Sequence, residues 1–265
     1  MAIKTKKTIH EKNHKLTVDT KSLRLTTMCT LEKHGGLFIL TLIGDDHEHR
    51  LGLSLIDSLL SALSQVNSQA INGGSALITV AHGKFFCNGF DVPWGQSDAR
   101  SRLHQMVESF RSVMSALLSL PIPTIAAVSG HAAAGGLVLA LGHDYVLMRR
   151  DRGFLYMSEV DLAITLPDYV AALMRSKIGG SAARRDVLLR GMKVKGEEAV
   201  RMGIVDSAAY DSEESVVEVA VRLGDRLTER KWNVEVYAEI RKSLYPELCG
   251  VLGLVSKTIV ASSKL

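Results

Sequence analysis

A run of small residues between two apolar segments is the first part of this sequence that could do chemistry. Residues Thr124–Val128 are apolar and partly β-branched, which predicts a buried strand. Residues Ser129–Gly136 are small except for His131, and Leu137–Leu141 can begin a helix. The first N–H groups of a helix have no intrahelical acceptor and lie at the positive end of its dipole. They can hold negative charge, although a tightly packed strand-to-helix turn without a ligand would show the same pattern.

Known phosphate-binding fingerprints do not account for this turn. The segment lacks the G-x-G-x-x-G pattern of dinucleotide-binding turns, and no G-x-x-x-x-G-K-[ST] pattern occurs in the chain. A dinucleotide or nucleoside triphosphate is therefore not predicted here. The turn remains a candidate for binding the charge that develops on a reacting oxygen atom.

The carboxylate of Glu159 is the second chemical candidate. Its neighbours in sequence are apolar: Leu155, Met157, Val160 and Leu162. Such surroundings would desolvate the carboxylate and raise its pKa toward neutrality, which suits a general base. A solvated loop acid is the alternative interpretation, and Asp161 is held in reserve as the base.

Composition excludes several classes of protein. The chain has 265 residues, 46% hydrophobic and 23% charged, which fits one large or two small domains with a buried core. The formal net charge is +4, but the charges nearly balance beyond Met28, so nucleic acid is not a predicted partner. No apolar run reaches the roughly 18 residues of a membrane span. Three widely spaced cysteines, Cys29, Cys87 and Cys249, predict free thiols in a reducing compartment and no CxxC metal site.

The two ends of the sequence have their own character. Residues 1–27 are basic and rich in Lys and Thr, which predicts a disordered extension, with a transit-like segment as the alternative. The tripeptide Ser263-Lys264-Leu265 matches the peroxisomal import signal. We therefore expect a peroxisomal protein that is bound by the import receptor.

Helical and strand patterns alternate along the chain and predict an α/β fold with right-handed crossovers. Loops are predicted at Ala81–Val92 and, in extended form, at Ser158–Pro167. From Ser212 onward the pattern is helical, with breaks at Pro246 and Gly250. The remaining predicted elements are a hairpin of Cys29–Lys33 and Leu37–Ile43; helices Leu53–Val66, Arg100–Leu120, Tyr169–Ile178, Ala182–Arg190 and Gly196–Met202; and strands Ala76–Val80, Tyr145–Met148, Gly153–Met157 and Ile204–Asp206.

Three segments follow one another in a fixed order. Gly83–Val92 contains F-x-x-G-x-D, and Pro123–Gly136 follows P-x-I-A-A-V-x-G-x-A-x-G-G-G. Phe154–Ala163 resembles F-x-x-P-E-V-x-L-G, with one additional residue between Phe154 and Ser158. Together, across residues 28–210, they resemble the crotonase superfamily of enoyl-CoA hydratases and isomerases. Three positions depart from these patterns, because Ala134, Ser158 and Ala163 stand for Gly, Pro and Gly.

The resemblance implies an architecture. It is a crotonase-like spiral of ββα repeats, with residues 28–210 as the α/β core. Residues 211–260 would be a C-terminal helical cover or oligomerisation region, and 261–265 a targeting tail. The resemblance also implies a homo-oligomer, either a trimer or a hexamer.

The resemblance further implies a site for an acyl-CoA thioester. The thioester oxygen would lie between the backbone N–H groups of Phe90 and Gly135, and Glu159 would be the base. No metal and no cofactor beyond the CoA of the substrate are implied.

One further position favours one reaction over another. Hydratases of this family resemble G-G-G-x-E, whose glutamate helps to activate water, and this sequence has Val138 there. Leu137, Val138 and Leu141 would line a dry apolar pocket. The resemblance is therefore to the single-glutamate Δ3,Δ2-enoyl-CoA isomerases. A hydratase or dehydratase, an acyl-CoA lyase and a catalytically silent acyl-CoA-binding protein remain as alternatives.

The CoA portion of the substrate has its own expected contacts. Lys84 and Arg50 are the candidates near its phosphates, and the Arg241-Lys242 pair is a candidate from a neighbouring subunit. The loop expected along the pantetheine and adenine comprises Cys87, Asn88, Gly89, Asp91 and Val92, of which Asp91 matches a mostly structural family position.

Three more residues invite an interpretation. His131 is expected to pack or form a hydrogen bond beneath the glycine turn, with a catalytic base as the alternative. Trp94 and Met106 are expected in the acyl pocket or in the helix wall behind it.

Overall fold

We analysed a computed structural model, which describes residues 28–44, 47–70, 73–91 and 98–257. The expected N-terminal extension, Val92, Trp94 and the Ser263-Lys264-Leu265 tripeptide lie outside the described residues.

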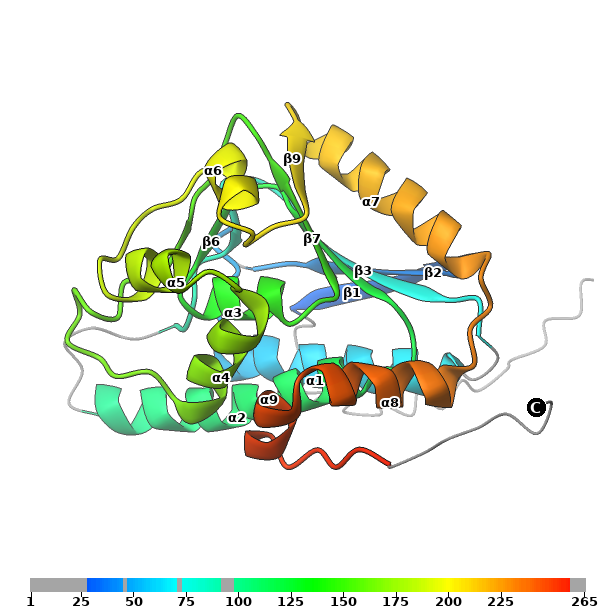
Figure 1. Cartoon of the computed structure of the whole chain (residues 1–265), viewed down its shortest axis with the longest axis horizontal. Helices are drawn as coiled ribbons and strands as arrows, with labels where there is room; N and C mark the ends of the chain where they lie inside the picture. The colour runs from blue at the N-terminus through cyan, green and yellow to red at the C-terminus, as the bar shows by residue number, and fades with distance from the viewer. Residues whose placement is uncertain (1–27, 45–46, 71–72, 92–97, 258–265) are drawn as a thin grey trace, which may run out of the picture.

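A six-stranded sheet forms the centre of the molecule (Figure 1). The predicted hairpin is confirmed: β1 and β2 pair antiparallel around Gly35, whose φ of 60° suits glycine. The other neighbouring strands pair parallel. In spatial order the strands are β1 (Cys29–His34), β2 (Leu37–Leu42), β3 (Ala76–Ala81), β5 (Thr124–Val128), β7 (Tyr145–Arg149) and β9 (Ser207–Tyr210).

A second, smaller parallel sheet contains β4 (Phe85–Cys87), β6 (His131–Ala133) and β8 (Leu155–Tyr156). The sequence predicted a loop across β4 and a turn across β6, which is wrong for these short strands, whereas β8 lies within the strand predicted at Gly153–Met157. Two or three residues carry no measurable periodicity, so pairing between distant segments defines the strands. The pairing is close: a Cβ on Gly130 would lie 2.3 Å from the carbonyl oxygen of Lys84.

Helices cover both faces of the large sheet (Figure 1). Helix α7 packs on one face of this sheet, against β2, β3, β5 and β7. Helices α1, α2 and α3 lie on the side of the opposite face. In chain order the helices are α1 (Leu53–Gln69), α2 (Ala99–Ser119), α3 (Gly135–Leu141), α4 (Asp168–Lys177), α5 (Ser181–Leu188), α6 (Gly196–Arg201), α7 (Glu213–Thr228), α8 (Val234–Leu244) and α9 (Pro246–Val251).

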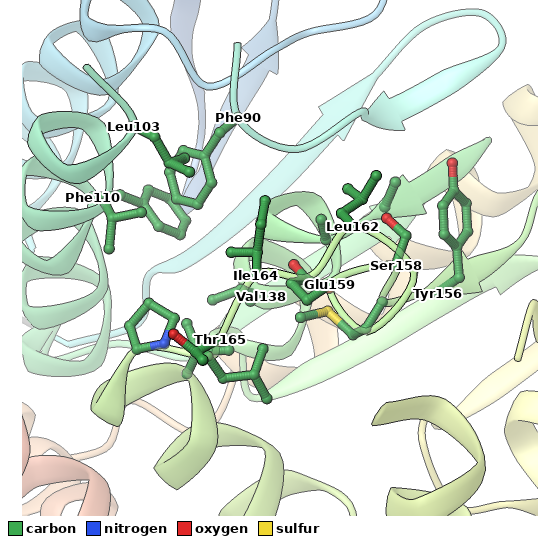
Figure 2. A pocket seen from close by; sticks show the side chains of 18 of the residues that line it. Phe90, Leu103, Phe110, Val138, Tyr156, Ser158, Glu159, Leu162, Ile164 and Thr165 are labelled. Atoms are coloured by element: carbon green, nitrogen blue, oxygen red, sulfur yellow. The ribbon is translucent and has the colours of Figure 1, made fainter. Parts of the chain in front are cut away.

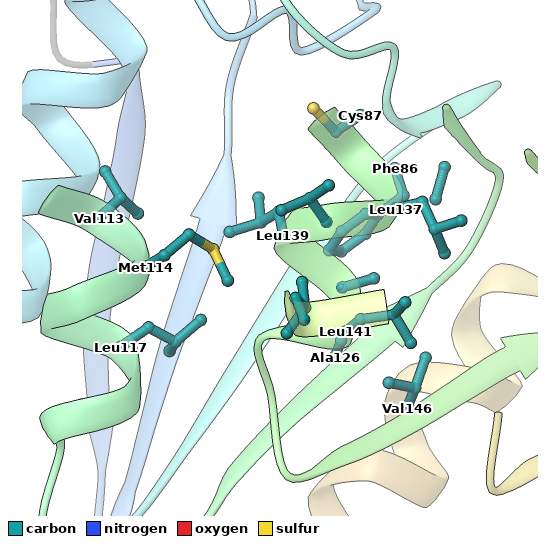
Figure 3. Packing of buried hydrophobic residues seen from close by; sticks show 14 of the residues in the cluster. Phe86, Cys87, Val113, Met114, Leu117, Ala126, Leu137, Leu139, Leu141 and Val146 are labelled. Carbon is teal, nitrogen blue, oxygen red and sulfur yellow. The ribbon is translucent and has the colours of Figure 1, made fainter. Parts of the chain in front are cut away.

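Helix α3 is buried along its whole length. Figure 3 shows Leu137, Leu139 and Leu141 packed among side chains of α2, β4 and β7. At its start, a Cβ on Gly136 would lie 2.1 Å from the carbonyl oxygen of Cys87, so only glycine allows this approach of α3 to β4. Packing therefore fixes the direction in which the first turn of α3 points.

Two predicted boundaries need correction. The strand expected at Ile204–Asp206 lies at Ser207–Tyr210, because Ile204 N–H still bonds to Ala199 at the end of α6. Gly250 does not end a helix, since α9 runs through it after Pro246 in the first turn. The predicted helical character of the region after Ser212 is confirmed, and Ser212 itself forms a capping box with Ser215.

Candidate active site

A cavity of about 370 Å³ lies where α2, α3, β8 and the segment before α4 meet (Figure 2). Its wall combines a polar portion with a longer apolar portion. The described residues that line it are Arg50, Asn88, Phe90, Leu103, Val107, Phe110, Ala133, Ala134, Gly135, Val138, Tyr156, Met157, Ser158, Glu159, Leu162, Ile164, Thr165, Leu166, Pro167 and Val170.

The first turn of α3 opens onto this cavity. Gly135 is the first helical residue, so its N–H has no intrahelical acceptor. Phe90 lies against it, since a Cβ on Gly135 would be 3.3 Å from the Phe90 ring. The Leu51 N–H donates to the Gly89 carbonyl oxygen (2.7 Å) and fixes the loop that carries Phe90. The cavity wall thus contains both residues that the sequence predicted as amide donors.

The residue before this turn has an unusual backbone. Ala134 has φ 49° and ψ −117°, a conformation that glycine adopts far more readily than other residues. Its methyl group lies close to Gly89, because a Cβ added to Gly89 would be 3.1 Å from the Ala134 Cβ. Ala134 therefore adopts a backbone conformation that favours glycine, at the position where the motif in the sequence analysis has glycine.

Glu159 projects into the cavity next to Val138 and Ile164 (Figure 2). Its Oε2 atom is buried and has no hydrogen-bond partner among the described residues. Burial raises the pKa of this carboxyl above its ordinary value, although the backbone N–H groups of Glu159 and Ser158 partly oppose the shift. An orphaned buried carboxylate oxygen of this kind is rare in proteins and marks a group whose partner is a ligand or a proton.

A compact turn presents this carboxylate. The Leu162 N–H donates to the Ser158 carbonyl oxygen (3.1 Å), and the Ile164 N–H donates to that of Glu159 (2.9 Å). Ala163 closes the turn with φ 53°, as the residue after a helix end does in a Schellman motif. The expected extended loop is therefore wrong at its start. The pattern of apolar and polar residues does not reveal an alanine in a conformation typical of glycine.

The reserve acid points elsewhere. Asp161 is exposed, and its Oδ2 would lie 2.9 Å from a Cβ added to Gly191, outside the cavity wall.

Helix α2 supplies an apolar wall that the sequence analysis did not assign to the site. Leu103, Val107 and Phe110 recur at helical spacing, and the Phe110 ring packs edge-on against Phe90 at 5.6 Å. Met106 lies on the core side of the helix and does not line the cavity. Helical periodicity would have grouped these three residues, but it does not tell which face meets a cavity.

The opposite end of the cavity is polar. Glu48 accepts hydrogen bonds from Arg50 Nε (2.8 Å) and from Asn88 Nδ2 (2.6 Å). Figure 2 shows Tyr156 on the opposite side of the cavity from Leu103 and Phe110. Burial raises the pKa of Tyr156, and the negative charge of Glu48 adds to this rise. Two of the predicted CoA contacts, Arg50 and Asn88, are therefore brought to the cavity.

Other predicted contacts are not in the cavity wall. Cys87 and Leu137 are fully buried in the core, and burial raises the pKa of Cys87 to about 12. About one helical turn separates Leu137 from Leu141 and Gly135 from Val138, so each pair shares a face of α3, and only the face of Gly135 and Val138 lines the cavity. The expectation that Leu137 and Leu141 line the pocket is wrong.

The other residues predicted to contact CoA lie in different surroundings. Gly89 has φ 77° beside Ala133 and Ala134, and Asp91 is exposed near Gly52. Lys84 is exposed, with its ammonium 5.2 Å from the centre of the Phe85 ring, and it does not line the cavity.

His131 packs as expected. It stacks on Phe154 at 5.4 Å, and its Nδ1 accepts a hydrogen bond from the Phe154 N–H (3.1 Å). Burial, followed by nearby positive charges that include Lys84, lowers its pKa, so the ring is neutral near pH 7.

The C-terminal cations have structural partners. Arg241 is 4% exposed and bonds to Asp144, and Lys242 pairs with Glu239 (2.7 Å). The expectation that Arg241 reaches CoA across a subunit boundary is wrong, because the side chain is committed inside its own chain.

The described residues indicate neither a metal site nor a helix that spans a membrane. They contain no group of three or more His, Cys, Asp or Glu side chains placed to hold a metal ion. Their helices are too short or too polar to cross a bilayer.

Comparison with known proteins now adds to this geometry. The sequence profile of the family "Enoyl-CoA hydratase/isomerase" matches residues 32–246. The chain belongs to this family. It is 63% identical to "Enoyl-CoA delta isomerase 2, peroxisomal" of Arabidopsis thaliana over 243 residues, which cover 90% of this chain and 100% of the relative. It is 50% identical to "Enoyl-CoA delta isomerase 1, peroxisomal" of the same plant, over 83% of this chain and 91% of the relative.

Solved structures confirm the predicted crotonase-type α/β fold. The apo structure of an enoyl-CoA isomerase from Mycobacterium tuberculosis superposes with a TM-score of 0.76 at 20% identity, covering 86% of this chain and 95% of the other. An enoyl-CoA hydratase from Bacillus anthracis gives 0.72 at 21% identity, with 82% of each chain covered. Because isomerase and hydratase share the fold, the site must distinguish the reaction.

Proposed function

We infer that the protein is an enoyl-CoA delta isomerase, which moves the double bond of a 3-enoyl-CoA to the 2-trans position. One observation carries this inference: Glu159 is the single acid among the described residues of the cavity wall, and one of its oxygens is buried without a partner. A double-bond shift needs one group that removes a proton and returns it. Relatives that share half or more of the sequence are named delta isomerases.

The reaction starts at the carbon between the thioester and the double bond. Glu159 removes a proton from C2, and the electrons move onto the thioester oxygen to form a dienolate. The N–H groups of Phe90 and Gly135 donate to this oxygen, and each such donor lowers the barrier by about 2.7–4 kcal/mol. Glu159 then delivers the proton to C4, which leaves the double bond between C2 and C3.

The environment of Glu159 suits both halves of this transfer. A raised pKa makes the carboxylate a stronger base toward C2, and the neutral acid formed is the better tolerated form in an apolar cavity. The backbone N–H groups of Glu159 and Ser158 limit this rise in the pKa. General-base catalysis of this kind contributes about 10²–10⁴-fold.

Val138 separates this reaction from hydration. Its side chain is buried in the cavity wall one helical turn after Gly135. A valine cannot orient or deprotonate a water molecule, so water addition to the 2-enoyl product lacks its second acid. We expect Val138→Glu alone to remain a poor hydratase, because the surrounding pocket must also admit and orient water.

The remaining features extend the proposal. The CoA portion lies toward Arg50 and Asn88, with no cofactor apart from the substrate's own CoA. The protein is peroxisomal, as the two relatives are named, and Ser263-Lys264-Leu265 is the proposed signal for the import receptor. A homo-oligomer, trimer or hexamer, follows from the family resemblance.

Two substrates test the reaction. The purified protein is incubated separately with trans-3-hexenoyl-CoA and trans-2-hexenoyl-CoA, and products are separated by chromatography. We expect rapid conversion of the first to the conjugated 2-enoyl thioester and negligible 3-hydroxyacyl-CoA from the second. Fast hydration of the second with slow isomerisation of the first would identify a hydratase instead. Binding of both without turnover would identify a silent acyl-CoA-binding protein.

A further inference from the structure

An acidic side chain behind the cavity wall is bonded to two residues of that wall. Glu48 Oε2 accepts hydrogen bonds from Asn88 Nδ2 (2.6 Å) and from Arg50 Nε (2.8 Å), and both donors line the catalytic cavity. Asn88 comes shortly before Phe90, whose N–H is a proposed donor to the thioester oxygen. We propose that Glu48 is a positioning residue, which holds the loop of Phe90 so that this N–H stays directed at that oxygen. The proposal rests on the proposed isomerase function.

Glu48 lies in a short segment that pairs with the loop of Phe90 in the manner of a parallel strand. The Asn88 N–H donates to the Glu48 carbonyl oxygen (2.9 Å). The Leu51 N–H donates to the Gly89 carbonyl oxygen (2.7 Å), and Leu51 forms a parallel β-bridge with Phe90. The position of the Phe90 N–H therefore depends on where this segment lies.

The segment belongs to the connection between β2 and α1 and has an irregular backbone. His47 and His49, on either side of Glu48, have φ values of 55° and 50°. Such conformations are unfavourable for residues other than glycine and persist only where surrounding contacts fix them. Two side chains supply contacts of this kind: His49 Nδ1 donates to the Phe85 carbonyl oxygen (3.0 Å), and the Glu48 carboxylate binds Asn88.

The same segment also contacts the other amide donor. A Cβ added to Gly135 would lie 2.9 Å from Leu51 Cδ1 and 3.3 Å from the Phe90 ring. A shift of the segment that carries Glu48 would therefore change the spacing of the two donors. Misplacement of a group by about 1 Å at a reacting centre can lower a rate about 100-fold.

Arg50 offers a rival role for Glu48. Its Nη2 also donates to the Glu48 carboxylate, and its side chain lies toward the expected CoA portion of the substrate. If Glu48 acted only through Arg50, its loss would weaken substrate binding and raise KM. Loss of the donor geometry instead lowers kcat, because the two N–H groups act most strongly on the charge of the transition state.

The test measures kcat and KM of the full chain for trans-3-hexenoyl-CoA. Glu48→Leu removes the acceptor with little change in size, and should lower kcat about 10–100-fold with KM within about threefold of the wild type. Arg50→Met should instead raise KM and change kcat little. Glu198→Leu is the matched control, because Glu198 is similarly exposed (35% against 31%) and pairs with Arg201 on α6, away from the cavity wall. Both of its kinetic parameters should stay within about twofold of the wild type.

A double-mutant cycle tests the route through Asn88. Asn88→Ala should also lower kcat, and the double variant with Glu48→Leu should be no slower than the slower single variant, because both remove the same contact. Glu48→Gln keeps an oxygen that accepts from Asn88, and should recover most of the wild-type kcat. If Glu48→Leu does not fold, Asn88→Ala must still lower kcat by about tenfold or more. Additive losses in the double variant would overturn the proposal.

Infrared spectroscopy measures the donor geometry without turnover. The probe is trans-2-hexenoyl-CoA with ¹³C at the thioester carbonyl, whose stretching band should move to lower frequency on binding and should move less in Glu48→Leu. Raised KM with unchanged kcat and an unchanged band in Glu48→Leu would overturn the proposal in favour of the role through Arg50. A wild type that shifts the band but does not isomerise trans-3-hexenoyl-CoA would reject the isomerase function, and the comparison of bands would still decide the role of Glu48.

Discussion

Two buried carboxyl groups lie near the two ends of α3, and they differ in their hydrogen-bond partners. Asp144 follows the C-terminal end and accepts hydrogen bonds from Thr124 N–H (2.9 Å), Tyr237 Oη (3.2 Å) and Arg241 Nε (2.7 Å). Burial acts to raise the pKa of Asp144, but the charge and hydrogen bonds of Arg241 hold it below its ordinary value. Glu159 faces the N-terminal end, and its pKa is raised. One of its oxygens has no hydrogen-bond partner in the part of the chain that the structure describes.

This difference in partners distinguishes a carboxylate with a structural role from one with a catalytic role. At one end, the carboxylate binds Tyr237 and Arg241 of α8 as well as the Thr124 N–H of β5, and so fastens α8 to the sheet. Arg241 also donates to the Ile122 carbonyl oxygen (2.5 Å). At the other end, the protein leaves a carboxylate oxygen free for a proton. Burial by itself therefore does not mark a catalytic acid, whereas burial without a partner does.

The largest expected effect is on turnover, from Glu159→Gln. The amide keeps the shape of the side chain but cannot accept a proton, so kcat for trans-3-hexenoyl-CoA should fall about 10²–10⁴-fold. Asp161→Asn is the matched control and should stay within about twofold, because its side chain lies outside the cavity. Activity of Glu159→Gln within tenfold of the wild type would remove the distinction between the two carboxylates.

The second effect is on stability, from Arg241→Met. This change leaves the Asp144 charge buried and unpaired, and should lower the free energy of unfolding by about 3–5 kcal/mol in urea denaturation. Adding Asp144→Asn should restore part of the loss, because no charge then remains buried. A single variant as stable as the double variant would show that the pair is not coupled.

The pH dependence should separate the same two groups. Activity needs ionised Glu159, whose pKa is raised, so kcat/KM should decline as pH falls through a value above the ordinary glutamate pKa of 4.5. The stability that Asp144 contributes is complete above its unfolded value of 3.8 and is lost only as pH falls through its lower folded value. Activity should therefore be lost at a higher pH than this stability, and the reverse order would contradict the comparison.

The smallest expected effect concerns the backbone beside the site. Ala134→Gly relieves a conformation that costs alanine about 1–3 kcal/mol, partly offset by the greater freedom of glycine in the unfolded chain, for a net gain near 1 kcal/mol. Ala133→Gly, in a strand position, should instead lose about 0.5–1 kcal/mol. Equal losses in both variants, measured by chemical denaturation, would show that Ala134 is not strained.

Much of the fold follows from local patterns. The hairpin around Gly35, the long helix α2 and the strand β5 are all periodic or punctuated strongly enough to predict. Strands β4 and β6 are not, because they exist through pairing between segments far apart in the chain, whereas β8 lies within the strand predicted at Gly153–Met157. The compact turn that carries Glu159 was also missed, since it depends on Ala163 taking a positive φ.

The functional site, like the fold, was predicted only in part from the sequence. Motif order placed Glu159, Phe90 and Gly135, and all three line one cavity. The rest of the wall depends on helix orientation: Val107 faces the cavity, while Met106 and Leu137 face the core. A sequence shows the spacing of side chains along a helix, but the rotation of that helix is set by contacts such as the approach of Gly136 to Cys87.

The central claim is that one carboxylate carries the same proton from C2 to C4. The direct measurement uses trans-3-hexenoyl-CoA with deuterium at C2, turned over in ordinary water, with the label at C4 of the product followed by NMR. The account predicts that a substantial part of the deuterium arrives at C4, because Glu159 is shielded from solvent between the two steps. Loss of the abstracted deuterium to solvent, with only solvent hydrogen added at C4 from the earliest turnovers, would contradict it.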